Sequence, residues 1–103
     1  MAYKIFYSNR SVSDLDELFD FFLLQGADKA GIESFFQNMK DKIKILEDFP
    51  LVGKQLFLPN GSETKYRYLI YKKYCIFYSV AEDTVKIERV IHSRRDYVSL
   101  LIR

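Results

Sequence analysis

The last third of the chain alternates between apolar and polar residues in three short runs. The runs cover residues 66–71, 74–80 and 85–91, and short turns at 72–73 and 81–84 separate them. A period of two places successive side chains on opposite faces of a β-strand. Because the connections are so short, neighbouring strands must pair antiparallel. The pattern therefore predicts a three-stranded meander.

Apolar residues in the first half repeat every three to four positions, which is typical of amphipathic helices. The first set is Val12, Leu15, Leu18, Phe19, Phe22 and Leu23, and the second is Ile32, Phe35, Phe36, Met39, Ile43 and Leu46. Ser11 and Ser13 are each followed three residues later by an Asp, which predicts the start of the first helix, and Gly26 predicts its end. Asp28 predicts the N-cap of the second helix. The short connection between the two makes them a helical hairpin.

Two further segments complete the predicted order. Residues 2–8 are rich in aromatic and β-branched side chains and predict a short strand. Residues 97–102 are apolar enough for a short helix or a strand-like tail. The order β-α-α-β-β-β predicts an α+β fold in which the helical hairpin packs on a small, mainly antiparallel sheet. No linker or repeat interrupts residues 1–103, so we expect a single domain.

Composition narrows the class of protein. Hydrophobic residues make up 49% of the chain and aromatic residues 17%, which favours a packed fold over disorder. No stretch approaches the roughly 18 consecutive apolar residues that cross a bilayer, and residues 1–6 do not resemble a signal peptide. We therefore expect a cytoplasmic protein with no membrane partner. With one Cys and one His, the chain has neither an internal disulfide nor a Cys/His zinc site, and we expect no cofactor.

Charge is distributed unevenly along the chain. Residues 1–64 hold seven basic and ten acidic residues, a balance of −3, whereas residues 65–103 hold nine basic and four acidic residues, a balance of +5. A basic sheet suits a polyanionic partner, either nucleic acid or an acidic protein segment. The alternative is a solvated surface whose asymmetry has no function.

The chain's only histidine lies in a polar cluster that follows the third predicted strand. His92, Arg94, Arg95, Asp96 and Tyr97 supply a base, two cations, an acid and a phenol. Metal-free cleavage of a phosphodiester needs a base, a proton donor and cations near the developing charge, and further cations are available at Arg67, Lys72 and Lys73. The structural alternative is that His92 caps the strand and that Arg94 pairs with Asp96. Paired arginines at a strand end also suit contact with a phosphate or carboxylate partner.

Some large apolar residues fall outside the predicted core. Phe21 lies off the main stripe of the first helix, and the tail carries Leu100, Leu101 and Ile102. We interpret these four residues as a surface for a partner helix. Tyr71 and Tyr74, beside the lysine turn, are expected to be exposed. Cys75 lies within a strand pattern and is expected to be a buried small hydrophobe.

The order and spacing of four segments resemble a known superfamily over nearly the whole chain. They are SVSDLDELFDFF, ILEDFPLVGKQL, YCIFYSV and IERVIHSRRDY. Together they are similar to toxins of the RelE/ParE superfamily, the toxic half of type II toxin–antitoxin modules. The resemblance implies a cognate antitoxin with a DNA-binding N-terminus and a segment that folds on binding, with higher-order toxin–antitoxin assembly as a further expectation.

The superfamily divides by mechanism, and the resemblance implies two different targets. RelE-like members are ribosome-dependent mRNA endoribonucleases with basic residues on the central strands, where this chain has Cys75 and Leu69. ParE-like members bind DNA gyrase without cutting RNA, and YCIFYSV with RVIHSRRD is more similar to them. We therefore favour a gyrase inhibitor over an enzyme. A third interpretation is an inactive chain that only binds its antitoxin.

Each interpretation assigns the residues differently. A metal-independent ribonuclease, acting on mRNA at the ribosome, would use Arg67, His92, Arg94 and Tyr97. A gyrase inhibitor would contact its target through Arg94, Arg95, Tyr97, Lys72 and Lys73. In either case, the antitoxin would contact Phe21, Leu100, Leu101 and Ile102.

Overall fold

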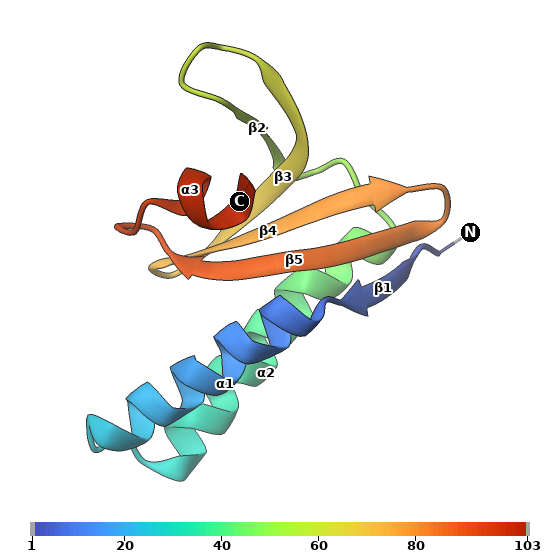
Figure 1. Ribbon diagram of the computed structural model, residues 1–103. Helices are drawn as coiled ribbons and strands as arrows, with labels where there is room; N and C mark the ends of the chain where they lie inside the picture. The colour runs from blue at the N-terminus through green and yellow to red at the C-terminus, as the bar shows by residue number, and fades with distance from the viewer. Residues whose placement is uncertain (1, 103) are drawn as a thin grey trace.

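The computed structural model describes residues 2–102 and has an α+β fold built on one five-stranded sheet (Figure 1). The strands lie in the order β1-β5-β4-β3-β2. Their bounds are Lys4–Tyr7 for β1, Lys54–Phe57 for β2, Glu63–Tyr71 for β3, Tyr74–Ala81 for β4 and Thr84–His92 for β5. The predicted meander is confirmed as β3, β4 and β5. The α+β class and the mainly antiparallel sheet are confirmed with it.

The two outer strands differ in how they join the sheet. β1 pairs parallel with the first half of β5, so that Ile5 lies opposite Val85. The second half of β5 extends past the end of β1, and α1 lies beside it (Figure 1). β2 is an edge strand antiparallel to β3, and the register of their pairing shifts between Gln55 and Phe57. The sequence did not predict β2, because four residues after a Pro/Gly loop show too little alternation to be distinguished from coil.

Four helical segments accompany the sheet, and local capping explains where they begin. They are α1 (Asn9–Leu24), α2 (Lys29–Lys44), the 3-10 turn η1 (Ile45–Glu47) and α3 (Tyr97–Ile102). The prediction that α1 starts at Ser11 or Ser13 was wrong, because Ser8 is the N-cap and its Oγ accepts from the Ser11 N–H at 3.0 Å. Asp28 caps α2 as predicted, through the Gly31 N–H at 2.9 Å.

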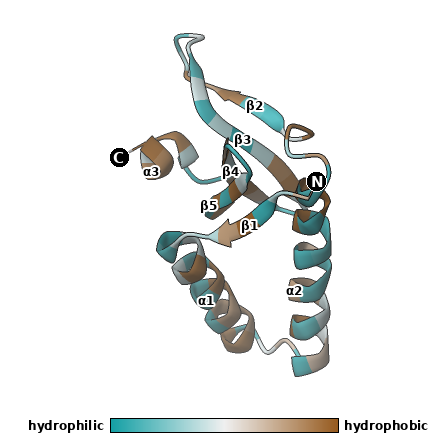
Figure 2. Cartoon of the chain, turned by 90° about the vertical axis from the view of Figure 1, so that its right-hand side faces the viewer, coloured by the Kyte–Doolittle hydropathy of each residue, from teal (hydrophilic) through white to brown (hydrophobic). Residues whose placement is uncertain are grey.

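The sheet separates two apolar layers. On one face, α1 and α2 form the predicted hairpin and cover Ile76, Tyr78 and Ile87. On the other face, α3 covers Phe77 and Cys75, so residues 97–102 form a helix rather than a strand-like tail (Figure 1). Figure 2 shows the two hairpin helices meeting at their connecting loop and separating toward the sheet, with hydrophobic residues along their inner sides. Within residues 2–102, no helix combines the length and apolarity needed to cross a membrane.

The two tyrosines beside the lysine turn are less accessible than we expected. Tyr71 and Tyr74 are half-buried, because the ring of Phe35 in α2 packs edge-on against both, at 5.2 and 5.9 Å between centroids. The Tyr71 hydroxyl is buried and has no hydrogen-bond partner within residues 2–102. Both side chains therefore belong to the packing between hairpin and sheet.

Candidate functional site

A groove of about 670 Å³ lies where the helical hairpin meets one end of the sheet. α1 and α2 form one wall, and the β3–β4 turn, the end of β5 and Arg95 form the other. The groove is lined by Asp14, Glu17, Leu18, Phe21, Phe22, Phe35, Lys72, Lys73, Tyr74, Val90, His92 and Arg95. It brings together residues that we predicted on separate surfaces, namely the basic turn, His92, Arg95 and Phe21.

A chain of aromatic contacts forms the floor of the groove. Phe22 of α1 meets Phe35 of α2 edge-on at 4.9 Å, and Phe35 meets Tyr74 of β4. Tyr74 in turn meets the imidazole of His92 at 5.3 Å, again edge-on. Edge-to-face pairs of this kind add stability beyond the area that they bury. Burial also raises the pKa of Tyr74, so the phenol stays neutral at physiological pH.

The basic rim is held by backbone contacts at the end of the sheet. Lys72 has a positive φ of 53° in the β3–β4 turn, the left-handed conformation that two-residue hairpin turns require. The Lys73 carbonyl accepts from the Ser93 N–H at 2.9 Å, which ties this turn to the end of β5. The Arg95 N–H donates to the His92 carbonyl at 3.0 Å. Three cationic side chains are thus gathered on one rim, opposite Asp14 and Glu17 of α1.

His92 has the structural contact that the sequence left as an alternative. Its Nδ1 accepts a hydrogen bond from the Arg94 N–H at 3.1 Å, which closes the turn after β5. Asp96 behaves differently from that alternative. Its carboxylate accepts from the N–H and the hydroxyl of Ser99, at 3.3 and 2.9 Å, and so caps the start of α3 instead of pairing with Arg94.

The residues that a ribonuclease would use lie on separate parts of the sheet. Arg67 is paired with Tyr78, four positions along β4 from Tyr74, the partner of His92. At about 3.3 Å per residue this is roughly 13 Å along the strand. The Arg67 guanidinium donates to the carbonyls of Leu51 and Gly53, at 3.2 and 2.9 Å. Tyr97 packs on Phe77 at 5.2 Å, on the α3 face of the sheet.

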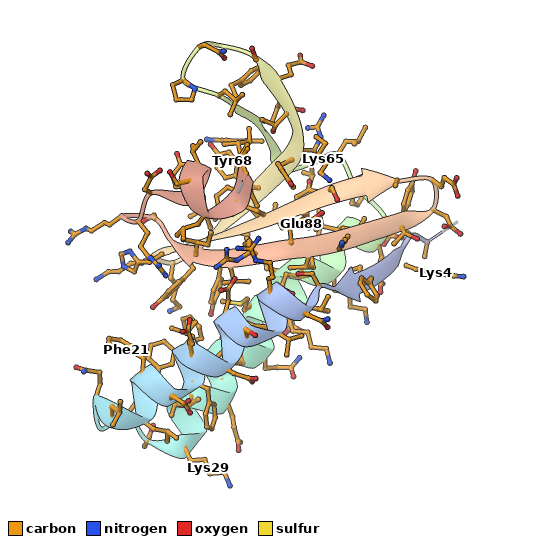
Figure 3. The ribbon with its side chains drawn as sticks, in the orientation of Figure 1. Lys4, Phe21, Lys29, Lys65, Tyr68 and Glu88 are labelled. Atoms are coloured by element: carbon orange, nitrogen blue, oxygen red, sulfur yellow. The ribbon has the colours of Figure 1, made fainter. Side chains whose placement is uncertain are left out.

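The predicted antitoxin surface is also divided. Phe21 is 50% exposed and lies in the groove, and Figure 3 shows it on the outer part of α1. Leu101 is only 5% exposed and packs with Phe77 and Cys75, so its assignment to a partner surface is corrected to the core. Leu100 is half-buried beside the same cluster, whereas Ile102 is 46% exposed. A short helix that packs on a sheet buries only one of its faces, so neighbouring residues differ in exposure.

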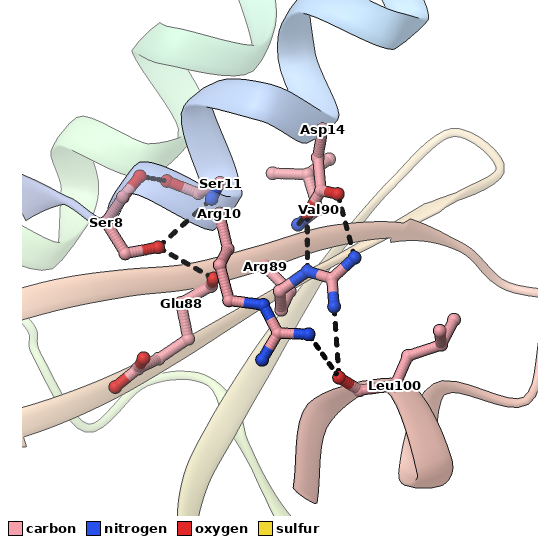
Figure 4. Close-up of polar contacts among 8 residues, drawn as sticks. All are labelled: Ser8, Arg10, Ser11, Asp14, Glu88, Arg89, Val90 and Leu100. Carbon is pink, nitrogen blue, oxygen red and sulfur yellow. Dashed lines mark hydrogen bonds and ion pairs between the residues drawn. The ribbon is translucent and has the colours of Figure 1, made fainter. Parts of the chain in front are cut away.

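A polar junction beside the groove was not predicted from the sequence (Figure 4). Asp14 of α1 accepts from Arg89 Nε and Nη2, at 2.8 and 2.9 Å, and from the Val90 N–H at 2.9 Å. The two side chains are 11% exposed for Arg89 and 8% for Asp14. The hydrogen bond to Asp14 raises the pKa of Arg89, against the effect of burial. Arg89 Nη1 also donates to the Leu100 carbonyl at 3.0 Å, so one guanidinium joins α1, β5 and α3.

The junction replaces strand pairing on the edge of β5 that faces away from β4, past the end of β1. Beyond the end of β1, the backbone N–H of Val90 would point at a helix with no strand to pair with. An unpaired buried N–H costs about 1–3 kcal/mol, and Asp14 removes that cost. Asp14 lies between Val12 and Leu15 of the predicted first helix, and nothing near it in the sequence indicates its partner, which is 75 residues away. Within residues 2–102, no three metal-ligand side chains are grouped to hold a metal ion.

The fold is similar to toxin–antitoxin structures. A chain of the chromosomal ParDE system from P. aeruginosa is 15% identical, with a TM-score of 0.58 over 88% of this chain and 96% of that one. A chain of the RelBE2 complex from Mycobacterium tuberculosis is 19% identical, with a TM-score of 0.59 over 89% and 99%. A chain of the E. coli DinJ-YafQ complex is 18% identical, with a TM-score of 0.54 over 89% and 93%. The chain thus shares its fold with these three chains.

Sequence comparison identifies the family of the chain. The family described as the ParE toxin of the type II toxin–antitoxin system parDE matches residues 5–97. The chain therefore belongs to the ParE toxin family. No curated protein sequence is significantly similar to it.

Proposed function

We propose that this chain is the toxin of a type II toxin–antitoxin module and that it inhibits growth by binding DNA gyrase. The observation that carries the choice of gyrase is the dispersal of the residues that RNA cleavage would need. Arg67 is bound to two backbone carbonyls, His92 lies at the other end of β4, and Tyr97 is on the opposite face. General acid–base catalysis requires such groups within hydrogen-bond reach of one substrate. Inhibition by binding to a protein does not require these groups to lie close together.

The groove suits the neutralising segment of a cognate antitoxin. Its floor is apolar and aromatic, and its rim carries Lys72, Lys73 and Arg95. An amphipathic segment would bury apolar side chains on Phe21 and Phe22 and direct acidic side chains toward that rim. Inhibition would then end when the antitoxin segment folds into the groove.

The target is tested with purified toxin in two parallel assays. We expect the protein to inhibit DNA supercoiling by gyrase and to leave mRNA intact in a translating extract. His92→Gln should retain growth inhibition within about threefold of wild type, because the imidazole would not act on a substrate. The alternative, a RelE-like ribonuclease, would be established by ribosome-dependent mRNA cleavage that this substitution abolishes. Unchanged supercoiling at a large excess of toxin would refute the gyrase proposal.

The groove is tested by antitoxin affinity. Reversing the charge of Lys72 and Lys73 to Glu should weaken antitoxin binding by about 10- to 100-fold, since each lost charge contact at an interface costs on the order of 1 kcal/mol. Phe21→Ser should weaken it by a similar factor. Lys65→Glu, the same type of charge reversal at a single exposed site on β3, is the control and should have little effect. Equal affinities for all variants would exclude the groove as the antitoxin site.

A further inference from the structure

A second apolar surface lies at the opposite end of the sheet from the groove. The segment Phe49-Pro50-Leu51-Val52 connects η1 to β2, and three of its side chains are strongly exposed: Phe49 at 63%, Leu51 at 61% and Val52 at 58%. Ile45 of η1 is 49% exposed beside them. Figure 2 shows this loop near the sheet end of α2, far from the tip of the helical hairpin. We call residues 49–52 the anchored loop.

The backbone of the anchored loop is fixed from both sides. The Phe49 N–H donates to the Ile45 carbonyl at 3.0 Å, and the Val52 N–H donates to the Phe49 carbonyl at 3.2 Å. The Arg67 guanidinium, on β3, donates to the carbonyl of Leu51 at 3.2 Å. At the end of the loop, the Gly53 N–H donates to the buried hydroxyl of Tyr78 at 2.9 Å. The loop is therefore a structured turn whose apolar side chains are exposed to solvent.

Core groups support this exposed turn. Tyr78 is fully buried, and burial raises its pKa although the Gly53 N–H and Arg67 act in the opposite direction. A Cβ on Gly53 would lie 2.9 Å from the Tyr68 carbonyl oxygen and closer still to the Tyr78 hydroxyl, so the chain passes over the sheet without room to shift. Binding to a segment that is already ordered avoids the entropy of ordering it. Such preorganisation is typical of interface anchors.

The area of the surface indicates the kind of partner. With roughly 200 Å² for a complete Phe side chain and less for aliphatic ones, the four exposed side chains offer about 400 Å². A symmetric contact between two copies would bury about 800 Å² in total, which is below the roughly 1,200 Å² of stable interfaces. Self-association is therefore disfavoured. A cluster of this size matches the central anchor of a larger interface with a different folded protein.

We propose that the anchored loop is the surface by which this toxin engages its target protein, inserting Phe49 and Leu51 into an apolar pocket of that protein. The inference rests on the proposed function for the identity of the target as gyrase. It locates the contact away from the residues that the sequence favoured for the target, which are Lys72, Lys73, Arg94, Arg95 and Tyr97. Because the groove lies at the other end of β4, the antitoxin segment and the target would occupy different surfaces of the toxin.

The test uses the double variant Phe49→Ser, Leu51→Ser in the full chain. The matched control is Phe6→Ser on β1, where the Phe is 57% exposed. Each variant is examined for its urea midpoint, its affinity for the cognate antitoxin, its inhibition of gyrase supercoiling and its inhibition of growth. We expect the double variant to keep its urea midpoint and antitoxin affinity, and to need at least tenfold more protein for both kinds of inhibition. Phe6→Ser should behave as the wild type.

Each outcome decides the proposal. Gyrase and growth inhibition within twofold of wild type would overturn it, as would an equal loss in Phe6→Ser. A tenfold loss of antitoxin affinity would assign the loop to the antitoxin instead. If the wild type itself does not inhibit gyrase, the proposed function fails and growth inhibition alone decides: loss in the double variant supports the loop, and retention overturns it. Val52→Ser provides a single milder variant should the double variant have a lower urea midpoint.

Discussion

Replacing Asp14 with Ala should be among the most damaging single changes to the fold. The substitution removes the acceptor of two Arg89 bonds and one Val90 bond, all between 2.8 and 2.9 Å. Removing one partner of a buried ion pair costs about 3–5 kcal/mol, because the other charge stays buried. Arg89 retains the Leu100 carbonyl at 3.0 Å, which places the expected loss at the lower end, about 3 kcal/mol.

Urea unfolding followed by circular dichroism measures this loss. For a domain of this size, a slope near 1–1.5 kcal/mol/M converts 3 kcal/mol into a midpoint about 2–3 M lower. Asp16→Ala on the same helix is the matched control, because Asp16 is exposed and its loss should change stability by less than about 0.5 kcal/mol. Asp14→Asn should fall between the two, since it keeps an acceptor but loses the charge. A loss below about 1 kcal/mol in Asp14→Ala would refute the assignment of Asp14 as the cap of the open β5 edge.

Three further predictions depend on buried groups. Gly53→Ala should destabilise the protein by about 2–3 kcal/mol, seen as a lower thermal midpoint, because the added methyl overlaps the Tyr78 hydroxyl. Burial raises the pKa of Tyr7, Tyr74 and Tyr78. Above pH 10 the unfolded chain therefore loses phenolic protons that the folded chain keeps, so the free energy of unfolding should fall as pH rises. Unfolding and tyrosinate absorbance at 295 nm should then appear together. Tyrosinate formation without unfolding would contradict this prediction. Cys75 is buried and its thiol pKa is raised by that burial, so a thiol reagent should react with it at least about 100-fold faster in urea than in the native state.

Periodicity predicted the elements whose side chains repeat over several turns or strand positions. The helical hairpin and the meander each carry six or more periodic residues, and both were found close to their predicted bounds. β2 has four residues and depends on β3 for its existence, so its sequence alone does not distinguish it. The helix start was missed by three residues because the capping side chain, Ser8, belongs equally to the end of the preceding strand, where its hydroxyl donates to the Glu88 carbonyl.

The site was less predictable because its contacts join distant parts of the chain. Lys72, His92 and Phe21 were each identified as candidates, but only the packing of the hairpin on the sheet places them in one groove. Arg67 was assigned by residue type to an RNA-cleaving site, whereas its bonds hold a loop. Arg89 was read simply as part of an alternating strand, since nothing local indicates an acceptor 75 residues earlier.

The parallel pairing of β1 with β5 also sets the order in which this protein folds during synthesis. Lys4–Tyr7 pair with residues 84–87, and the Ser8 and Asp14 contacts span 75 to 80 residues. Closing a loop of that length costs about 4 kcal/mol of chain entropy before any of these contacts form. The nascent chain therefore lacks the strand that joins β1 to β4 until β5 has left the ribosome. A chain that terminated before Thr84 would leave β1 and one edge of β4 unpaired, and such exposed strand edges invite pairing with other chains.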